Sequence, residues 1–169
     1  MRTKFFLLIA FSFLISTTFA QQNSPWKDWS WLLGEWAGDG GGQPGLGGGT
    51  FSFKPDLDGK ILVRKAQTDF PARGNQPALS HTDMMIISLD YSGYPTKAIY
   101  FDNEGHTINY TISYATNTIV LTSEKIPNVP IFRLTYSLLD NQMVNTKFEM
   151  SQDGEKFMTY IEGKSKKIK

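Results

Sequence analysis

The sequence predicts an all-β fold, a roughly ten-stranded antiparallel up-and-down barrel with a short N-terminal helix closing one end. Three observations lead to this expectation. Apolar and polar residues alternate over many short stretches, as in strands that bury one face. Turn residues separate nearly all of these stretches, and no predicted helix is long enough for a parallel crossover. Because a long meander protects its edges best by closing, we expect a barrel, with a two-sheet sandwich as the alternative.

The start of the chain has the layout of a secretory signal peptide. Arg2 and Lys4 precede an apolar stretch, Phe5–Ile15, and small residues lead up to Gln21. This stretch is about half of the roughly 20 residues that a membrane-spanning helix needs. We therefore expect cleavage near Ala20 and a secreted or periplasmic protein with no membrane span. The chain is predicted to divide into a signal peptide at 1–20, an N-terminal lead with a short helix at 21–30, and a barrel at 31–169.

The short helix is predicted from capping and spacing. Ser24 is a typical N-cap, and Trp26, Trp29 and Leu33 share one face at helical spacing. Gly34 can end this helix or 3₁₀ segment. Because such a short segment is unstable alone, we expect its tryptophans to dock on the barrel.

The clearest predicted strand is 106–114, in which Ile108, Tyr110, Ile112 and Tyr114 share one face and smaller polar residues occupy the other. The pattern indicates one buried and one solvated face. After a first strand around Trp36, further strands are expected at 50–54, 60–70, 81–90, 96–102, 118–124, 131–139, 143–150 and 156–164.

The glycine-rich run Gly38–Gly49 is predicted to be a connection between two strands. A phosphate-binding glycine loop requires a helix immediately after the glycines, whereas a strand beginning at Thr50 follows here. In a barrel, this run and the loops Pro71–Ser80 and Ile126–Pro130 are expected to border the open end, where they would control access.

The charge balance argues against nucleic acid or acidic lipid as a partner. The 169-residue chain has a formal net charge of +1, which becomes −1 without Arg2 and Lys4. The sequence contains no cysteine, so disulfides and thiol chemistry are excluded. Oligomeric state does not follow from the sequence.

The Gly34-x-Trp36 motif on a first strand, preceded by a short helix, resembles the lipocalin (calycin) group of barrels. The resemblance implies that Trp36 packs at the closed end against a late basic residue, for which Arg133, Lys147 and Lys164 are the possible partners. The last third also resembles a bacterial lipocalin-like secreted family of unknown function, through the stretches 98–106, 132–136 and 147–154.

The longer pattern Gly34-x-Trp36-x-Gly38-x-Gly40 resembles the opening of nitrobindin-type haem barrels. That family holds haem through a histidine near its C-terminal end. The two histidines of this chain are His81 and His106, so the resemblance fails at the residue that would bind iron. A tyrosine such as Tyr136 or Tyr160 can also bind haem iron, but the sequence predicts no cofactor.

Aromatic residues on the apolar strand faces point to a cavity. Buried tyrosines need hydrogen-bond partners, so several facing inward indicate a partly polar interior. An inward-facing arginine, Arg64 or Arg133, could hold a carboxylate, although the sequence does not assign its face. The candidate ligand-binding residues are Trp36, Arg64, His81, Tyr110, Arg133, Tyr136 and Phe148.

No catalytic residue and no metal site is predicted. His81 and Asp83 share a strand face and could join His106 around zinc, but a third firm ligand is lacking. We therefore expect a barrel that binds a small, mostly apolar or amphipathic molecule without chemistry. The alternatives are a barrel enzyme, dependent on haem or on His81 as acid or base, and a structural or interaction module with a filled barrel.

Overall fold

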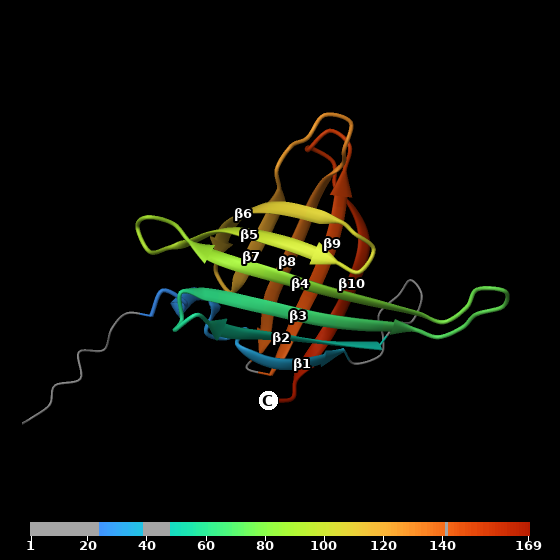
Figure 1. The fold of residues 1–169 in the computed structure, drawn as a ribbon, viewed down its shortest axis with the longest axis horizontal. Helices are drawn as coiled ribbons and strands as arrows, with labels where there is room; N and C mark the ends of the chain where they lie inside the picture. The colour runs from blue at the N-terminus through green and yellow to red at the C-terminus, as the bar shows by residue number, and fades with distance from the viewer. Residues whose placement is uncertain (1–23, 39–47, 141) are drawn as a thin grey trace, which may run out of the picture.

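A computed structural model describes residues 24–38, 48–140 and 142–169 and confirms the predicted closed antiparallel barrel (Figure 1). Each strand pairs with its neighbours in the chain, and β1 closes the barrel against β10, which excludes an open two-sheet sandwich. The strands are β1 (Gly34–Gly38), β2 (Gly48–Asp56), β3 (Ile61–Phe70), β4 (Leu79–Leu89), β5 (Pro95–Asp102), β6 (Thr107–Ala115), β7 (Thr118–Ser123), β8 (Ile131–Asp140), β9 (Met143–Ser151) and β10 (Met158–Lys167). The predicted signal peptide and most of the glycine-rich run lie outside the described residues.

The alternation that predicted the strands decides which side chains face inward. On β6, Tyr110 and Ile112 are buried, whereas Thr111 between them and Ser113 after them are exposed. On β8, Leu134 and Tyr136 are buried, and their register partners on β9 are Phe148 and Thr146. Residues paired in register share a face, so the two strands present these four side chains to the interior.

The predicted N-terminal helix is a single 3₁₀ turn, Lys27–Trp29, that closes one end of the barrel. Trp26 and Trp29 are buried, and each indole N–H donates a hydrogen bond to a turn region. Trp26 Nε1 bonds the carbonyl of Gly59 at 2.8 Å, and Trp29 Nε1 bonds the Tyr114 hydroxyl at 2.9 Å. These bonds hold the 3₁₀ turn against the β2–β3 and β6–β7 ends of the barrel.

Trp36 lies at this closed end, but none of the three predicted basic partners accompanies it. The Nζ of Lys167 lies over its ring, 5.3 Å from the centroid. The reason is register: Lys167 is paired directly with Trp36 across β1 and β10, whereas Lys164 pairs with Asn145 on β9. The Trp36 indole donates to the carbonyl of Leu32 at 2.8 Å, which ties the first strand to the 3₁₀ turn.

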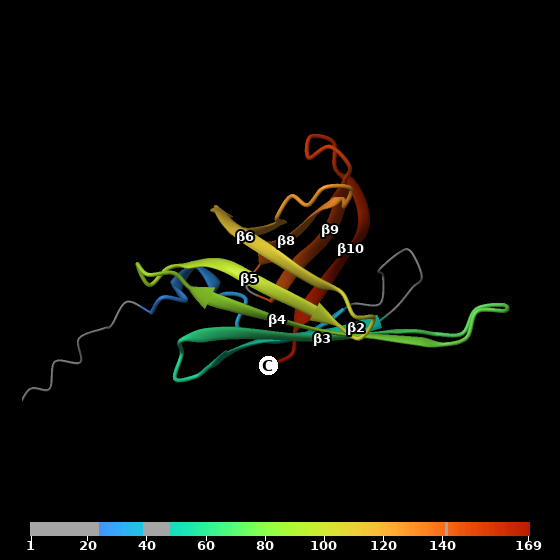
Figure 2. The same cartoon turned by 45° about the horizontal axis from the view of Figure 1, so that its top comes forward.

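The opposite end of the barrel carries the β3–β4, β5–β6, β7–β8 and β9–β10 connections, since alternate turns of an up-and-down barrel lie at opposite ends. The β3–β4 hairpin extends beyond the barrel wall (Figure 2). Its tip, predicted as a loop, is closed by a bridge in which Arg73 and Gln76 exchange backbone hydrogen bonds of 3.0 Å. We call this end the open end.

Candidate functional site

The barrel interior differs between its two halves. Towards the closed end it is filled by fully buried side chains, among them Trp29, Trp36, Phe53, Leu62 and Ile87. Towards the open end the inward-facing residues Ala66, Tyr100, Ile108, Phe132 and Phe148 are only partly buried and pack against this core. We call this half-exposed region, lined by these five residues, the open half. On β3 the boundary between the core and the open half falls between Arg64, which is buried, and Ala66, which is partly buried.

An ion pair lies at this boundary. Arg64 on β3 is only 8% exposed, and its Nη1 donates to the carboxylate of Asp83 on β4. The Asp83 side chain is 9% exposed, and its burial raises its pKa, against the opposing effect of the Arg64 charge. A charged pair this deeply buried requires additional hydrogen bonds to be fully compensated.

Those additional bonds are incomplete. Arg64 Nε, the Tyr136 hydroxyl and Thr146 Oγ1 are buried atoms with no hydrogen-bond partner among the described residues. Burial raises the pKa of Tyr136 to about 12, so its hydroxyl stays neutral and can donate. Tyr136 packs against the rings of both Phe51 and Phe53, with centroids 5.9 and 5.4 Å away, and those two rings lie 6.0 Å apart. Because buried polar groups are nearly always paired, these three atoms are available to a further polar group; Tyr136 also lies close enough to Arg64 for the guanidinium to oppose the rise of the Tyr136 pKa.

A second set of polar groups lies nearer the open end. His81 Nδ1 is 2.9 Å from the Glu104 carboxylate, and its Nε2 is 3.1 Å from the Tyr100 hydroxyl. Tyr100 also donates to Asp102 at 3.3 Å, and its burial raises its pKa above the usual range. The His81 Nε2 lies 3.8 Å from Asp83, beyond hydrogen-bonding distance, so this set is a neighbour of the buried ion pair and is not bonded to it.

His106 borders the same set from the β5–β6 turn. Its Nδ1 lies 2.9 Å from Asp102, whose side chain is almost fully covered. Burial raises the pKa of Asp102, but hydrogen bonds from the backbone and ring of His106 outweigh it and lower the pKa below the ordinary value. Among the described residues, no group of three or more His, Asp or Glu side chains is arranged to hold a metal ion.

Two of the predicted ligand-binding residues lie apart from this cluster. Arg133 is on the outer face of β8, where its Nε donates to Glu149 at 2.8 Å and its guanidinium lies over Phe157, 3.8 Å from the centroid. Trp36 lies in the core at the closed end. Arg64, Tyr110 and Tyr136 do meet inside the barrel, His81 lies at the open end, and Phe148 stacks on Phe132 in the open half with centroids 5.7 Å apart.

Other members of the cluster were not predicted, namely Tyr100, Asp102, Glu104 and Thr146. Alternation on β5 gives a usable signal, because Tyr100 and Asp102 share a face, and Asp102 is the register partner of Asp83. Thr146 gives no such signal, since a threonine within a strand is common on either face.

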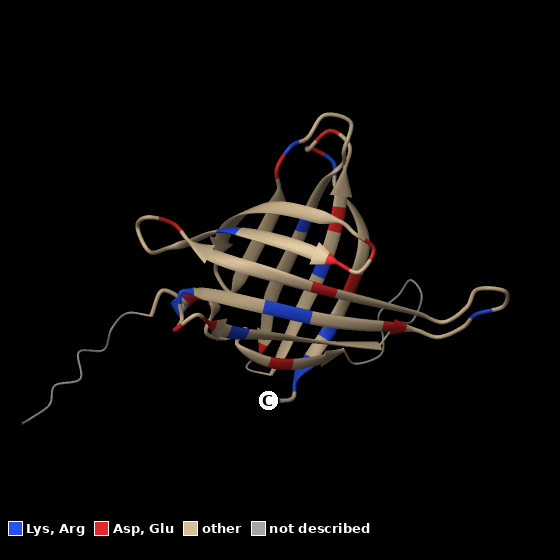
Figure 3. Ribbon diagram, viewed as in Figure 1, with Lys and Arg blue, Asp and Glu red and all other residues tan. Residues whose placement is uncertain are grey.

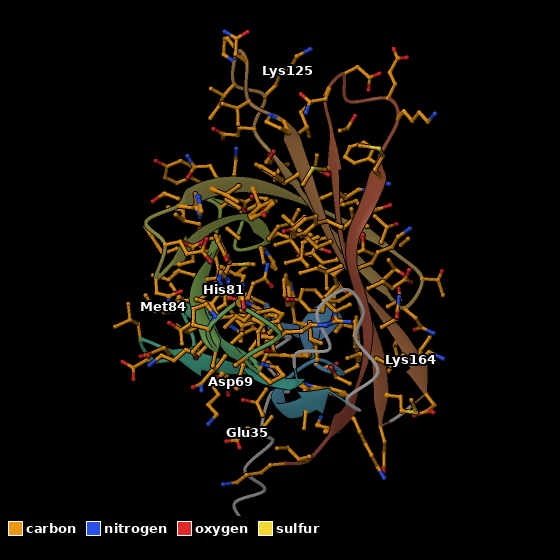
Figure 4. The ribbon with its side chains drawn as sticks, turned by 90° about the vertical axis from the view of Figure 1, so that its right-hand side faces the viewer. Glu35, Asp69, His81, Met84, Lys125 and Lys164 are labelled. Carbon is orange, nitrogen blue, oxygen red and sulfur yellow. The ribbon has the colours of Figure 1, made fainter. Side chains whose placement is uncertain are left out.

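Two clefts in the described part of the chain open to the surface. One, of about 660 Å³, lies along the outer wall formed by β1–β5; outward-facing side chains such as Ser52, Lys65 and Met84 line it, together with the inward-facing residues Phe51, Ala66 and Asp83. Glu35 and Met84 lie on this outer wall (Figure 4). The other, of about 550 Å³, lies at the base of the β3–β4 hairpin beside Phe70 and Leu79. Both are open to solvent, so neither is an enclosed cavity.

Lysine, arginine and acidic residues are scattered along the strands in the view of Figure 3, without separation by sign. Within the ranges 24–38, 48–140 and 142–169, no helix has the length and apolar character to cross a membrane.

Comparisons with known proteins place the chain by its fold. No protein-family model and no curated protein matches it. Among solved structures, it is similar to Rv2717c from M. tuberculosis, with a TM-score of 0.58 over 86% of this chain and 98% of that chain. The two sequences are 16% identical, so this likeness concerns the architecture: an all-β closed barrel of antiparallel strands.

Proposed function

We propose that the protein is a secreted or periplasmic lipocalin-like barrel that binds a small, mostly apolar or amphipathic molecule in its open half. The observation that carries the proposal is the set of three buried polar atoms without partners, Arg64 Nε, Tyr136 Oη and Thr146 Oγ1. Leaving a buried donor unpaired costs about 1–3 kcal/mol, so a bound polar group there would recover free energy.

The surroundings of these atoms fit an amphipathic ligand. Phe132, Phe148 and Ile108 are partly buried and offer apolar contact above the polar boundary. Ligand sites are commonly apolar with a few polar groups that fix orientation. The polar end of the ligand would reach the boundary, and the apolar body would lie along the aromatic side chains.

The test measures binding of the neutral fluorescent probe N-phenylnaphthylamine to the mature protein. Ile108 faces inward on β6, is partly buried and does not line the outer cleft, so Ile108→Trp would fill the open half and abolish binding. The matched control is Met84→Trp, which places the same side chain on the outer wall. Both variants are checked for folding by thermal unfolding.

Unchanged probe binding in a folded Ile108→Trp variant would overturn the proposal. Loss of binding only in Met84→Trp would instead move the site to the outer cleft. Native mass spectrometry of the protein from its own host adds an independent readout. A co-purified small molecule is expected with the wild type and not with the variant whose open half is filled by tryptophan. N-terminal sequencing of the same sample is expected to begin at Gln21, as export with signal cleavage requires.

A further inference from the structure

We infer that the site at the barrel boundary takes a neutral ligand whose polar end is a hydrogen-bond acceptor, such as a ketone or ester carbonyl, and rejects the corresponding carboxylate. This inference rests on the proposed binding function and names the chemical class of its ligand. It differs from the expectation raised by an inward-facing arginine, which by itself would favour a carboxylate.

The unpaired atoms require an acceptor. The Nε–H of Arg64 can only donate, because a guanidinium has no acceptor atom. Arg64 is 8% exposed and Tyr136 is fully buried, so bulk water reaches neither group freely. A ligand amine or other cation would leave the Arg64 donor unpaired, whereas a carbonyl oxygen accepts two hydrogen bonds and can serve both residues.

The local charge disfavours an anion. The charge of Arg64 is already compensated by Asp83, to which its Nη1 is bonded. Asp102 is the register partner of Asp83 and adds a negative charge beside it, and Glu104 adds another at the open end. The basic groups facing this set are the imidazoles of His81 and His106, each bonded to one of these carboxylates. A ligand carboxylate would therefore enter a region where acidic groups outnumber guanidinium groups, and would also lose its hydration.

The direction of the Arg64 side chain also fits a ligand in the open half. The register partner of Arg64 on β4 is Met85, but its guanidinium bonds Asp83. Asp83 is the register partner of Ala66, which is the next inward-facing residue of β3 towards the open end. The side chain therefore extends from the core towards the open half. The neighbouring inward-facing residue of β3 is Ala66, whose small side chain leaves space beside the guanidinium.

The experiment compares two competitors of equal carbon number, methyl nonyl ketone and undecanoate, for displacement of N-phenylnaphthylamine at about pH 8, where a carboxylate is ionised. In the wild type the ketone is expected to displace the probe at a concentration about tenfold lower than undecanoate. Tyr136→Phe keeps the ring and removes one of the two proposed donors, so the probe still binds and the ketone is expected to displace it several-fold less well. Asp83→Asn leaves Arg64 uncompensated, so the preference is expected to reverse.

The outcomes separate the inference from the proposed function. Failure of the probe to bind the wild type would overturn the proposed function. Probe binding with undecanoate equal to or better than the ketone would overturn only the inference, as would an unchanged ratio in folded Asp83→Asn. If Asp83→Asn does not fold, Asp102→Asn replaces it, because this variant removes one negative charge and keeps the Arg64–Asp83 pair. The ratio of the displacing concentrations of ketone and undecanoate should then move in favour of the carboxylate. A ratio that does not move in that direction overturns the inference.

Discussion

The guanidinium of Arg64 extends past its own register partner to bond the carboxylate of Asp83 inside the barrel. Both side chains are at least nine-tenths buried, so the pair replaces hydrating water with a single charged contact. Another donor of the same guanidinium, the Nε–H of Arg64, is buried and has no partner in the described part of the chain. This relationship accounts for both the stability and the ligand preference expected of the site.

Arg64→Met is expected to destabilise the protein by about 3–5 kcal/mol at neutral pH, because it leaves the Asp83 charge buried without compensation. The loss should shrink as the pH falls. Burial already raises the pKa of Asp83, and removal of the guanidinium raises it further. The folded state therefore holds a proton that the unfolded state releases, so stability falls as pH rises through the Asp83 pKa. Urea unfolding at several pH values measures this.

A double variant provides the control. Arg64→Met with Asp83→Leu removes both charges and both polar surfaces, so its unfolding free energy is expected to return to within about 1–2 kcal/mol of the wild type. A double variant as unstable as Arg64→Met would show that lost packing, rather than the unpaired carboxylate, causes the effect.

Gly34→Ala is expected to cost about 2–3 kcal/mol. Gly34 has φ +112°, and a Cβ there would lie 2.2 Å from the carbonyl oxygen of Lys169. The matched control is Gly59→Ala, where φ is +77° but nothing lies within 4 Å, so only the backbone term of about 1 kcal/mol remains. Urea denaturation of the two variants compares them directly, and equal losses would contradict the role of the Lys169 contact.

Most of the fold could be predicted because strand alternation and turn residues are local signals. The 106–114 pattern corresponds to β6. The expectation that Gly34 ends the N-terminal segment is wrong, because the 3₁₀ turn ends at Trp29 with Ser30 as its C-cap and Gly34 is the first residue of β1. The basic partner of Trp36 could not be chosen, because register between β1 and β10 joins residues from opposite ends of the chain. That register alone places Lys167 beside Trp36, while Lys164 pairs with Asn145 on β9.

The site was harder to predict than the fold. The stretch Ile61–Val63 is apolar on both faces, so alternation could not assign the side of Arg64. Arg133 was predicted as a ligand-binding residue without an assigned face. The structure places it on the outer face of β8, opposite Leu134 and Tyr136, and the alternation along 131–139 is a signal that was not applied to it. The pairing of Arg64 with Asp83 depends on the reach of a long side chain past its register partner, which a one-dimensional pattern does not contain.

Tyr114→Phe is expected to destabilise the closed end by about 1–3 kcal/mol. The Tyr114 hydroxyl accepts from Trp29 Nε1 at 2.9 Å and donates to the carbonyl of Pro95, so its removal leaves two buried groups unpaired. Tyr91→Phe is the control, since that side chain is fully exposed and the change should stay within about 0.5 kcal/mol. Thermal unfolding measures both, and a neutral Tyr114→Phe would show that water replaces the hydroxyl.

His106 is expected to titrate above the ordinary range of histidine. Its hydrogen bond to Asp102, at 2.9 Å, is the main cause, and the Asp102 charge adds to it; together they raise the pKa above 6.5. Because the folded state then binds the proton more tightly, this interaction stabilises the fold fully below the unfolded pKa and is lost as pH rises through the folded value. NMR titration of the imidazole ring measures the pKa, and Asp102→Asn should lower it towards 6.5. A wild-type ring that already titrates at or below that value would contradict the pairing, because no charged hydrogen bond would then hold the β5–β6 turn at the open end.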